Sequence, residues 1–324
     1  MSRTTKILLI IAGVFIVIGL LVGVYFLGKL KNSVNNSNNS TANGPGTTQK
    51  SDSVAQDPNG PYYAKIYTAT SQDGLTWQKN NQLLFDHASV PSAVIKDGII
   101  YLYFIDASGY SADKVSVAIS KDLGKSFEKQ IAVIKGATLA PVDPDPVLLD
   151  NGKIRLYYFA APAPANASNP VGDPATAPGQ HQIMLAQSSD GINFESPREV
   201  FSEEKITDPD VFKTTKDWRL FVSKGMALDL AISTDDGTTF TKQNDFLWNS
   251  GGVSGTADIS GTLRTYYCGQ GGIASATGAE TGKLTAEPGT RVEEQNKIVC
   301  DPSVIELPDN TFLMFYKVQE LTQT

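Results

Sequence analysis

This 324-residue chain has only two cysteines and two histidines, and they form no cluster with zinc spacing. The chain contains no Ser/His/Asp elbow, no phosphate-binding loop and no dinucleotide fingerprint, so no cofactor is expected. It also lacks a basic excess, since 27 Lys and Arg stand against 34 Asp and Glu, giving a formal net charge of −7. No basic stripe exists to neutralise phosphates, which argues against a nucleic-acid partner.

Long apolar runs are absent except at the N-terminus. Residues 7–27 are apolar or glycine without a charge, which is close to the ~20 residues that cross a bilayer core. The run is too long for a typical signal peptide, and neither an A-x-A-like site nor a cysteine follows it, although a cleaved signal peptide remains the alternative. The flanking basic residues are nearly balanced and orient the span only weakly. We expect the N-terminus inside and the body outside, because the body resembles an exported domain.

The chain divides into three parts by composition. Residues 1–31 contain the transmembrane anchor with its short flanks. Residues 32–60 are mostly Asn, Ser, Thr and Gly, which bury too little apolar surface to offset their ordering entropy, so we predict a disordered linker. Residues 61–324 form the body.

A signal of Ser-x-Asp, a Gly and then an aromatic residue occurs four times in the body. In each copy the Asp carboxylate can accept from nearby backbone N–H groups, the Gly takes a positive φ, and the aromatic ring packs back on the sheet. We interpret these turns as structural. The copies are Ser71 to Trp77, Ser120 to Phe127, Ser188 to Phe194 and Ser233 to Phe240.

A second signal alternates with the first. A short strand, usually with Pro near its start, is followed by a hairpin turn and a strand rich in Tyr and Phe. These strands start at Val90-Pro91, Asp145-Pro146, Asp208-Pro209 and Asp301-Pro302, with a degenerate copy from Gly255.

Each unit therefore holds four strands, a to d, and five units follow one another at about 50 residues, which is a propeller pattern. No helical periodicity competes with it. The last unit, from Asp301, has only strands a and b, whereas residues 62–84 supply only c and d. We predict an all-β, five-bladed propeller of four-stranded antiparallel blades, closed by pairing of N- and C-terminal strands, which removes an exposed edge.

Aspartates gather where strand a begins, around the central channel. Several acids around one funnel suit glycoside hydrolysis, in which one carboxyl acts as acid and another as base or nucleophile. Crowded like charges also push pKa values apart. The alternative is that each Asp before Pro caps a strand and bonds a neighbouring blade. The candidate catalytic residues are Asp143, Asp145, Asp208, Asp210 and Asp301.

The loops between strands b and c lie on the same face. The segment 160–180 is a candidate rim or lid, and Asp106 and Lys224 lie in equivalent loops. His87 precedes the first strand a, facing either the funnel or solvent. We take His87, Asp106 and Lys224 as candidate substrate-binding residues. Carboxylates and carbonyls also bind calcium without a motif, so a structural calcium stays open.

The two cysteines lie near the same face in adjacent blades. Cys268 ends strand b of blade four, and Cys300 begins strand a of blade five. In an oxidising compartment the two can form a disulfide, and two unpaired buried thiols are the alternative.

The Asp-Pro strand starts, Tyr-rich second strands and Ser-x-Asp-Gly turns resemble the five-bladed propeller glycoside hydrolases of the family 43 and arabinanase type. The turns also resemble the Asp-boxes of sialidases. The resemblance covers the whole body and implies a carbohydrate partner, with an Asp base on the first blade, an Asp pKa modulator on the second and a Glu acid on the third. Those positions match Val90, Asp145 and Asp208 here, so a carboxylate is missing and Asp replaces Glu.

Other acids are candidates for the two missing roles. Asp86 or Asp106 would replace the base, and Glu203 or Glu204 would supply the acid. A sialidase needs an arginine triad and usually six blades with an N-terminal Phe-Arg-Ile-Pro motif. That motif is absent and five arginines lie in the body, so sialidase ranks lower.

Two functional hypotheses follow. The first is a membrane-anchored, extracytoplasmic glycoside hydrolase acting on polysaccharide or glycan. The second is a non-catalytic propeller that binds carbohydrate or another surface partner, with no workable acid and base pair in its funnel.

Overall fold

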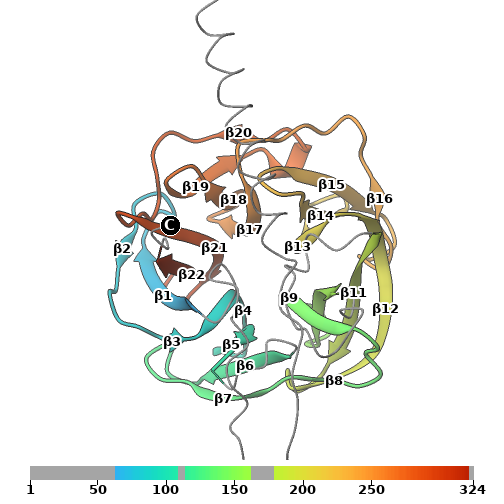
Figure 1. Cartoon of the computed structure of the whole chain (residues 1–324), viewed down its shortest axis with the longest axis horizontal. Helices are drawn as coiled ribbons and strands as arrows, with labels where there is room; N and C mark the ends of the chain where they lie inside the picture. Colours follow the sequence, from blue (N-terminus) through green and yellow to red (C-terminus); the bar gives the residue numbers. More distant parts are fainter. Residues whose placement is uncertain (1–62, 109–113, 162–178, 321–324) are drawn as a thin grey trace, which may run out of the picture. The chain divides into compact units, whose positions relative to one another are not determined.

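The computed structural model describes residues 63–108, 114–161 and 179–320, and these residues form five antiparallel blades in a ring (Figure 1). The first strand of each blade lies nearest the ring axis, and later strands lie further out. The prediction of a five-bladed, all-β propeller is confirmed.

Each blade contains four strands, a to d, and two blades carry one additional short strand. The strands of blade 1 are β4 (Ala88–Lys96), β5 (Ile99–Asp106), β6 (Val115–Ser120) and β7 (Glu128–Ile131). Those of blade 2 are β9 (Ala140–Leu148), β10 (Ile154–Ala161), β11 (Gln180–Ser188) and β12 (Asn193–Glu204). Those of blade 3 are β13 (Thr207–Lys213), β14 (Trp218–Ser223), β15 (Leu228–Ser233) and β16 (Thr241–Lys242). Those of blade 4 are β17 (Gly252–Ile259), β18 (Thr262–Gly269), β19 (Gly272–Thr277) and β20 (Thr285–Ala286). Those of blade 5 are β21 (Lys297–Glu306), β22 (Phe312–Glu320), β1 (Ala64–Ser71) and β2 (Gln78–Lys79). The additional strands are β3 (Phe85–Asp86), beside β1, and β8 (Val133–Ile134), parallel to β12.

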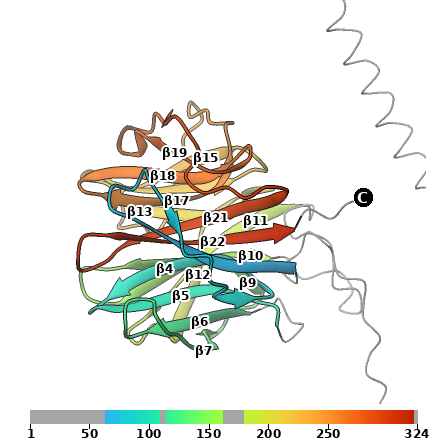
Figure 2. The ribbon, with the colours of Figure 1, turned by 90° about the vertical axis from the view of Figure 1, so that its left-hand side faces the viewer.

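Blade 5 closes the ring by joining the two ends of the body. Strand β1 pairs with β22 along its whole length, from Ala64 opposite Gln319 to Ser71 opposite Phe312. Figure 2 shows the two strands lying side by side. The predicted closure by N- and C-terminal strands is therefore confirmed, and the pairing covers an edge that β22 would otherwise expose.

The part of the chain that the structure describes contains no helix long and apolar enough to cross a membrane. The span predicted over residues 7–27 and the linker over 32–60 lie outside that part, so both stay predictions. Most of the segment 160–180 also lies outside it.

Every innermost strand is interrupted at one equivalent position near its start. There a non-glycine residue adopts a left-handed backbone conformation, and the ladder to the next strand shifts register. Such bulges re-aim a side chain and persist only where the surroundings hold them. We call these five residues the mouth ring. They are Val90, Asp143, Asp208, Val253 and Asp301, with φ between 48° and 52°.

This register corrects the position assigned to the second blade. The sequence repeats Asp-Pro at Asp143 and again at Asp145, and the resemblance matched the second copy to Val90 and Asp208. In the structure Asp143 carries the positive φ, whereas Asp145 pairs with Tyr157 as Ser92 pairs with Tyr103. Asp143 is therefore the blade 2 equivalent of Val90.

The two repeated sequence signals bond to each other across blades. A buried tyrosine on strand b of one blade donates a hydrogen bond of 2.8 Å from its hydroxyl. The acceptor is the glycine carbonyl in the Asp-turn of the next blade. The glycine also leaves room for the tyrosine, since a Cβ at Gly237 would lie 2.5 Å from the Tyr157 hydroxyl. The pairs are Tyr103 with Gly191, Tyr157 with Gly237, and Tyr266 with Gly74. The turns thus join blades on the face away from the mouth ring.

Replacing Tyr103 by Phe is expected to lower the free energy of unfolding by about 1–2 kcal/mol, because the buried Gly191 carbonyl loses its donor. Chemical denaturation measures this change. Tyr63→Phe is the matched control, since Tyr63 is 51% exposed. Equal losses in the two variants would contradict the structural role given to the Tyr103 hydroxyl.

Candidate functional site

The mouth ring brings three carboxylates together around one end of the channel. Asp143, Asp208 and Asp301 come from blades 2, 3 and 5, while blades 1 and 4 contribute Val90 and Val253. Asp143 and Asp208 are partly exposed, and Asp301 is 5% exposed. One side of the ring is therefore acidic at two adjacent positions, and the third acid lies between two valines.

Asp143 and Asp208 are hydrogen-bonded neighbours from adjacent blades. The Asp208 backbone N–H donates to Asp143 Oδ2 at 3.4 Å, and Thr207 Oγ1 donates to Asp208 Oδ2 at 2.6 Å. Burial raises the pKa of Asp143 well above its ordinary value, and the negative charges of Asp208 and Asp301 raise it further. Asp143 consequently keeps a proton at pH values where an ordinary aspartate has lost it.

Asp301 is held by its Oδ2 atom. This oxygen accepts from the Val90 backbone N–H at 3.1 Å and from Ser89 Oγ at 3.5 Å, and lies 2.8 Å from Lys317 Nζ. Burial alone would lower the pKa of Lys317, but the charge of Asp301 and its hydrogen bond outweigh burial and raise that pKa. The ion pair thus places a cation in the acidic ring.

Lys317 was not identified from the sequence. It lies in β22, where it faces Cys300 across the ladder, and its side chain is 17% exposed. The available signal was a single lysine inside the otherwise apolar run from Phe312 to Val318.

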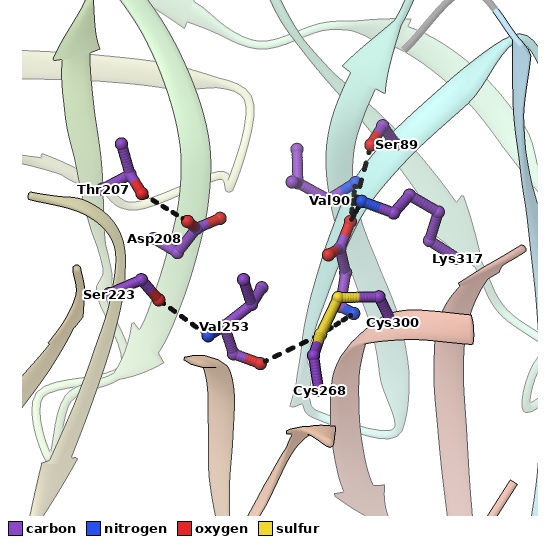
Figure 3. The surroundings of a disulfide bond; sticks show 10 residues. Ser89, Val90, Thr207, Asp208, Ser223, Val253, Cys268, Cys300 and Lys317 are labelled. Carbon is purple, nitrogen blue, oxygen red and sulfur yellow. Dashed lines mark hydrogen bonds and ion pairs between the residues drawn. A yellow bond between two sulfur atoms is a disulfide. The ribbon is translucent and has the colours of Figure 1, made fainter. Parts of the chain in front are cut away.

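A disulfide joins Cys268 and Cys300, confirming the predicted pairing (Figure 3). It links β18 of blade 4 to β21 of blade 5, with Cα atoms 4.9 Å apart. The Asp301 backbone N–H donates to Cys268 Sγ at 3.2 Å. The disulfide therefore fixes the backbone immediately before Asp301.

Asp145 and Asp210 are turned toward neighbouring blades rather than the mouth. Asp145 Oδ2 accepts from the Val211 N–H at 2.7 Å, and Asp210 Oδ1 accepts from the Thr256 N–H at 2.9 Å. Burial raises the pKa of both carboxyls, and the charge of Asp210 adds to the effect on Asp145. Their contacts match the alternative foreseen from the sequence, in which an aspartate bonds the next blade.

The candidate substrate-binding residues have their own partners. His87 lies 3.4 Å from Asp86 through Nδ1, and both side chains are 46% exposed. Asp106 pairs with Lys129 and accepts from the Ser108 N–H at 3.0 Å. Within the described ranges, no hydrogen bond or ion pair connects Asp86, His87 or Asp106 to a mouth-ring carboxylate.

Glu203 and Lys224 belong to an ion-pair cluster between blades 2 and 3. Glu203 Oε1 lies 2.7 Å from Lys224 Nζ and 2.6 Å from Lys242 Nζ. Burial opposes ionisation of Glu203, but the two lysines lower its pKa. A carboxyl that readily loses its proton is a poor general acid, and this argues against Glu203 in that role. Among the residues that the structure describes, no hydrogen bond or ion pair connects Glu204 to a mouth-ring carboxylate.

The mouth carboxylates do not converge on one point. A metal site would need at least three His, Cys, Asp or Glu ligand atoms close together. Among the described residues, one such group has its ligand atoms within 4.8 Å of one another, and it consists of Cys268, Cys300 and Asp301. Both sulfurs of that group are in the disulfide. A cavity of about 710 Å³ lies at the opposite channel end, lined by the later halves of all five innermost strands.

No family model matches this chain, and no curated protein matches it in sequence. Solved structures do match it. An α-L-arabinofuranosidase from Clostridium thermocellum is 15% identical, with 70% of this chain and 80% of that chain covered and a TM-score of 0.51. A GH43_1 enzyme from Xanthomonas citri, complexed with xylotriose, is 14% identical, with 72% and 86% covered and a TM-score of 0.51.

A family 43 β-xylosidase/α-arabinofuranosidase from a compost microbial metagenome, also in complex with xylotriose, is 17% identical. The match covers 73% of this chain and 92% of that chain, with a TM-score of 0.50. At these identities the likeness shows the fold, which is the five-bladed propeller of family 43 glycoside hydrolases, as the sequence motifs predicted. The likeness of the turns to sialidase Asp-boxes stays a prediction.

Proposed function

We propose that this chain is a membrane-anchored glycoside hydrolase that cleaves oligosaccharide or polysaccharide at the mouth ring. The observation that carries the proposal is the contact between Asp143 and Asp208 on adjacent blades at the channel mouth, where the charge of Asp208 raises the pKa of Asp143. A carboxyl whose surroundings raise its pKa is suited to act as a general acid.

Asp143 is the proton donor in this proposal. Glycoside hydrolysis needs a carboxyl that is still protonated when the glycosidic oxygen departs, and a second carboxylate that activates water or attacks the sugar. Asp143 meets the first requirement because burial and the charge of Asp208 raise its pKa. Asp208 lies on the next blade and stabilises the positive charge that develops on the sugar ring.

The sugar class is taken from the structural likeness. Two of the enzymes with this fold were determined with xylotriose, so pentose oligosaccharides are the first substrates to test. We further propose that the propeller lies on the extracytoplasmic side, held by the span predicted at residues 7–27. The disulfide Cys268–Cys300 supports an oxidising compartment.

A non-catalytic carbohydrate-binding propeller is the second candidate. The specific observation in its favour is that Val90 and Val253 occupy two of the five mouth-ring positions and supply no ionisable group. The two candidates differ in turnover and not in binding.

The test is to incubate the full-length chain with chromogenic pentosides and pentose oligosaccharides, and to measure xylotriose binding by calorimetry in parallel. We expect turnover by the wild type and a loss of about 10²-fold or more in Asp208→Asn, with binding retained. Lys213→Gln is the matched control, since Lys213 is exposed and contacts exposed Asp150. Binding without turnover in the wild type would favour the second candidate.

A further inference from the structure

We infer that Asp301, paired with Lys317, is the second carboxylate of the reaction and acts as the base that activates water. The inference rests on the proposed function and adds the residue that completes its chemistry. It moves the base to blade 5, because the blade 1 position holds Val90.

The mouth ring offers few alternatives to Asp301. Val90 and Val253 have no ionisable group, and Asp208 directly adjoins the acid Asp143. Asp145 and Asp210 accept hydrogen bonds from the next blades. A base that activates water must also be separated from the acid to leave room for the water and the sugar. Asp301 meets this requirement, since blade 1 lies between its blade and that of Asp143 (Figure 1).

The two oxygens of Asp301 differ in their surroundings. The three contacts of the carboxylate with described residues, from Ser89, Val90 and Lys317, are all made by Oδ2. Within the described residues, Oδ1 accepts no hydrogen bond, yet it is not among the buried polar atoms that lack a partner. Oδ1 therefore retains a small exposed surface, on a side chain that is 4% exposed as a whole. One oxygen anchors the side chain, and the other is available to a water molecule.

Lys317 and the disulfide act as positioning groups for this carboxylate. Lys317 Nζ is held 2.8 Å from Oδ2 and balances its negative charge. On the backbone side, Cys268 Sγ accepts from the Asp301 N–H, and Cys300 is the preceding residue (Figure 3). The carboxylate is thus held at both its side-chain end and its backbone end. A group that reacts with a substrate atom needs such precise positioning.

The proposed step balances as a single displacement. Asp301 Oδ1 takes one proton from water as the water oxygen bonds to the anomeric carbon. The bond from that carbon to the glycosidic oxygen breaks, and Asp143 donates its proton to the departing oxygen. Proton exchange with solvent then restores the protonated Asp143 and the ionised Asp301.

The test compares Asp301→Gly and Asp301→Asn with the wild type on an activated pentoside, with and without sodium azide. We expect both variants to lose about 10²–10⁴-fold in turnover. In Asp301→Gly, azide enters the vacated space, attacks the anomeric carbon without a base and restores turnover, with glycosyl azide as the product. A residue with only a structural role gives no such rescue. Asp145→Gly is the control, and we expect azide not to change the turnover of this variant.

Melting temperature and disulfide content establish that the variants are folded, and Asp301→Asn retains an amide oxygen that can accept from Val90. Folded variants with wild-type turnover, or folded inactive variants that azide does not rescue, would overturn the role of Asp301 alone. A wild type without turnover would overturn the proposed function and this inference together. Lys317→Met provides a further readout: a positioning role predicts a lower kcat with a nearly unchanged KM, because Nζ no longer holds Oδ2 in place.

Discussion

Asp143→Asn is expected to lower kcat/KM for a pentoside by about 10²–10⁴-fold, the range for loss of a general acid. An amide cannot supply the proton that the glycosidic oxygen needs. In the wild type, burial and the charge of Asp208 raise the pKa of Asp143, so activity should persist toward neutral pH and fall as the pH rises through that pKa. The basic limb of the wild-type kcat/KM profile measures this value, and the limb should disappear in Asp143→Asn.

The same substitution should preserve stability while it removes activity. A carboxyl whose pKa is higher in the folded than in the unfolded chain stabilises the fold at low pH and loses that contribution as the pH rises through the folded value. Asn resembles the protonated form, so at pH 7 the variant should melt at or above the wild-type temperature. The two melting temperatures should approach each other near pH 4.

Asp145→Asn is the matched control, because it lies two residues away and turns toward blade 3. Its amide oxygen can still accept from the Val211 N–H, so turnover should stay within about tenfold of the wild type. An inactive Asp145→Asn beside an active Asp143→Asn would contradict the register that places Asp143 at the mouth.

Replacing both cysteines by serine is expected to lower the free energy of unfolding by about 3–4 kcal/mol, since the disulfide closes a loop with a sequence separation of 32. Denaturation by guanidinium chloride measures the loss. Turnover of the folded variant should fall too, because the residue before Asp301 is no longer covalently linked to blade 4. Wild-type protein treated with a reductant should reproduce both changes.

The single variant Cys268→Ser separates the covalent bond from simple packing. It should lose nearly as much stability as the double variant, because either substitution breaks the same link. A double variant within about 1 kcal/mol of the wild type would show that the disulfide does not restrain blades 4 and 5.

The architecture was predictable from the sequence because its two motifs repeat. Four of the five units carry an Asp-turn, and most carry a Tyr-rich strand. The structure shows why the two motifs occur together: the Tyr157 hydroxyl donates to the Gly237 carbonyl in the next blade. Because this contact recurs at several blade junctions, the residues that form it also repeat along the sequence. Ring closure was equally predictable, because the first and last units are complementary halves of one blade.

The register at the mouth was not predictable to the residue. Asp143-Pro144 and Asp145-Pro146 are equivalent as dipeptides, and the choice depends on which residue takes the positive φ. That choice is made by long-range contacts, including the bond from the Asp208 N–H to Asp143. A repeated dipeptide cannot encode such a contact.

The ion-pair partners of the candidate site residues were also not predictable from the sequence. Lys317 pairs with Asp301 across a strand ladder, so the two lie 16 positions apart in the sequence but 2.8 Å apart in space. The sequence predicts Glu203 as a candidate acid, but Lys224 and Lys242 from blade 3 form ion pairs with it. In both cases the partner comes from another strand, and sequence spacing alone does not identify it.

The most direct test of the proposed hydrolysis is to follow the anomeric protons of xylotriose by NMR during incubation with the full-length wild-type chain. The account predicts new reducing-end signals that grow with time in the wild type and stay absent in Asp143→Asn. Xylotriose signals that broaden on binding while no new reducing end appears, over a panel of pentose oligosaccharides, would contradict hydrolysis and leave a carbohydrate-binding propeller.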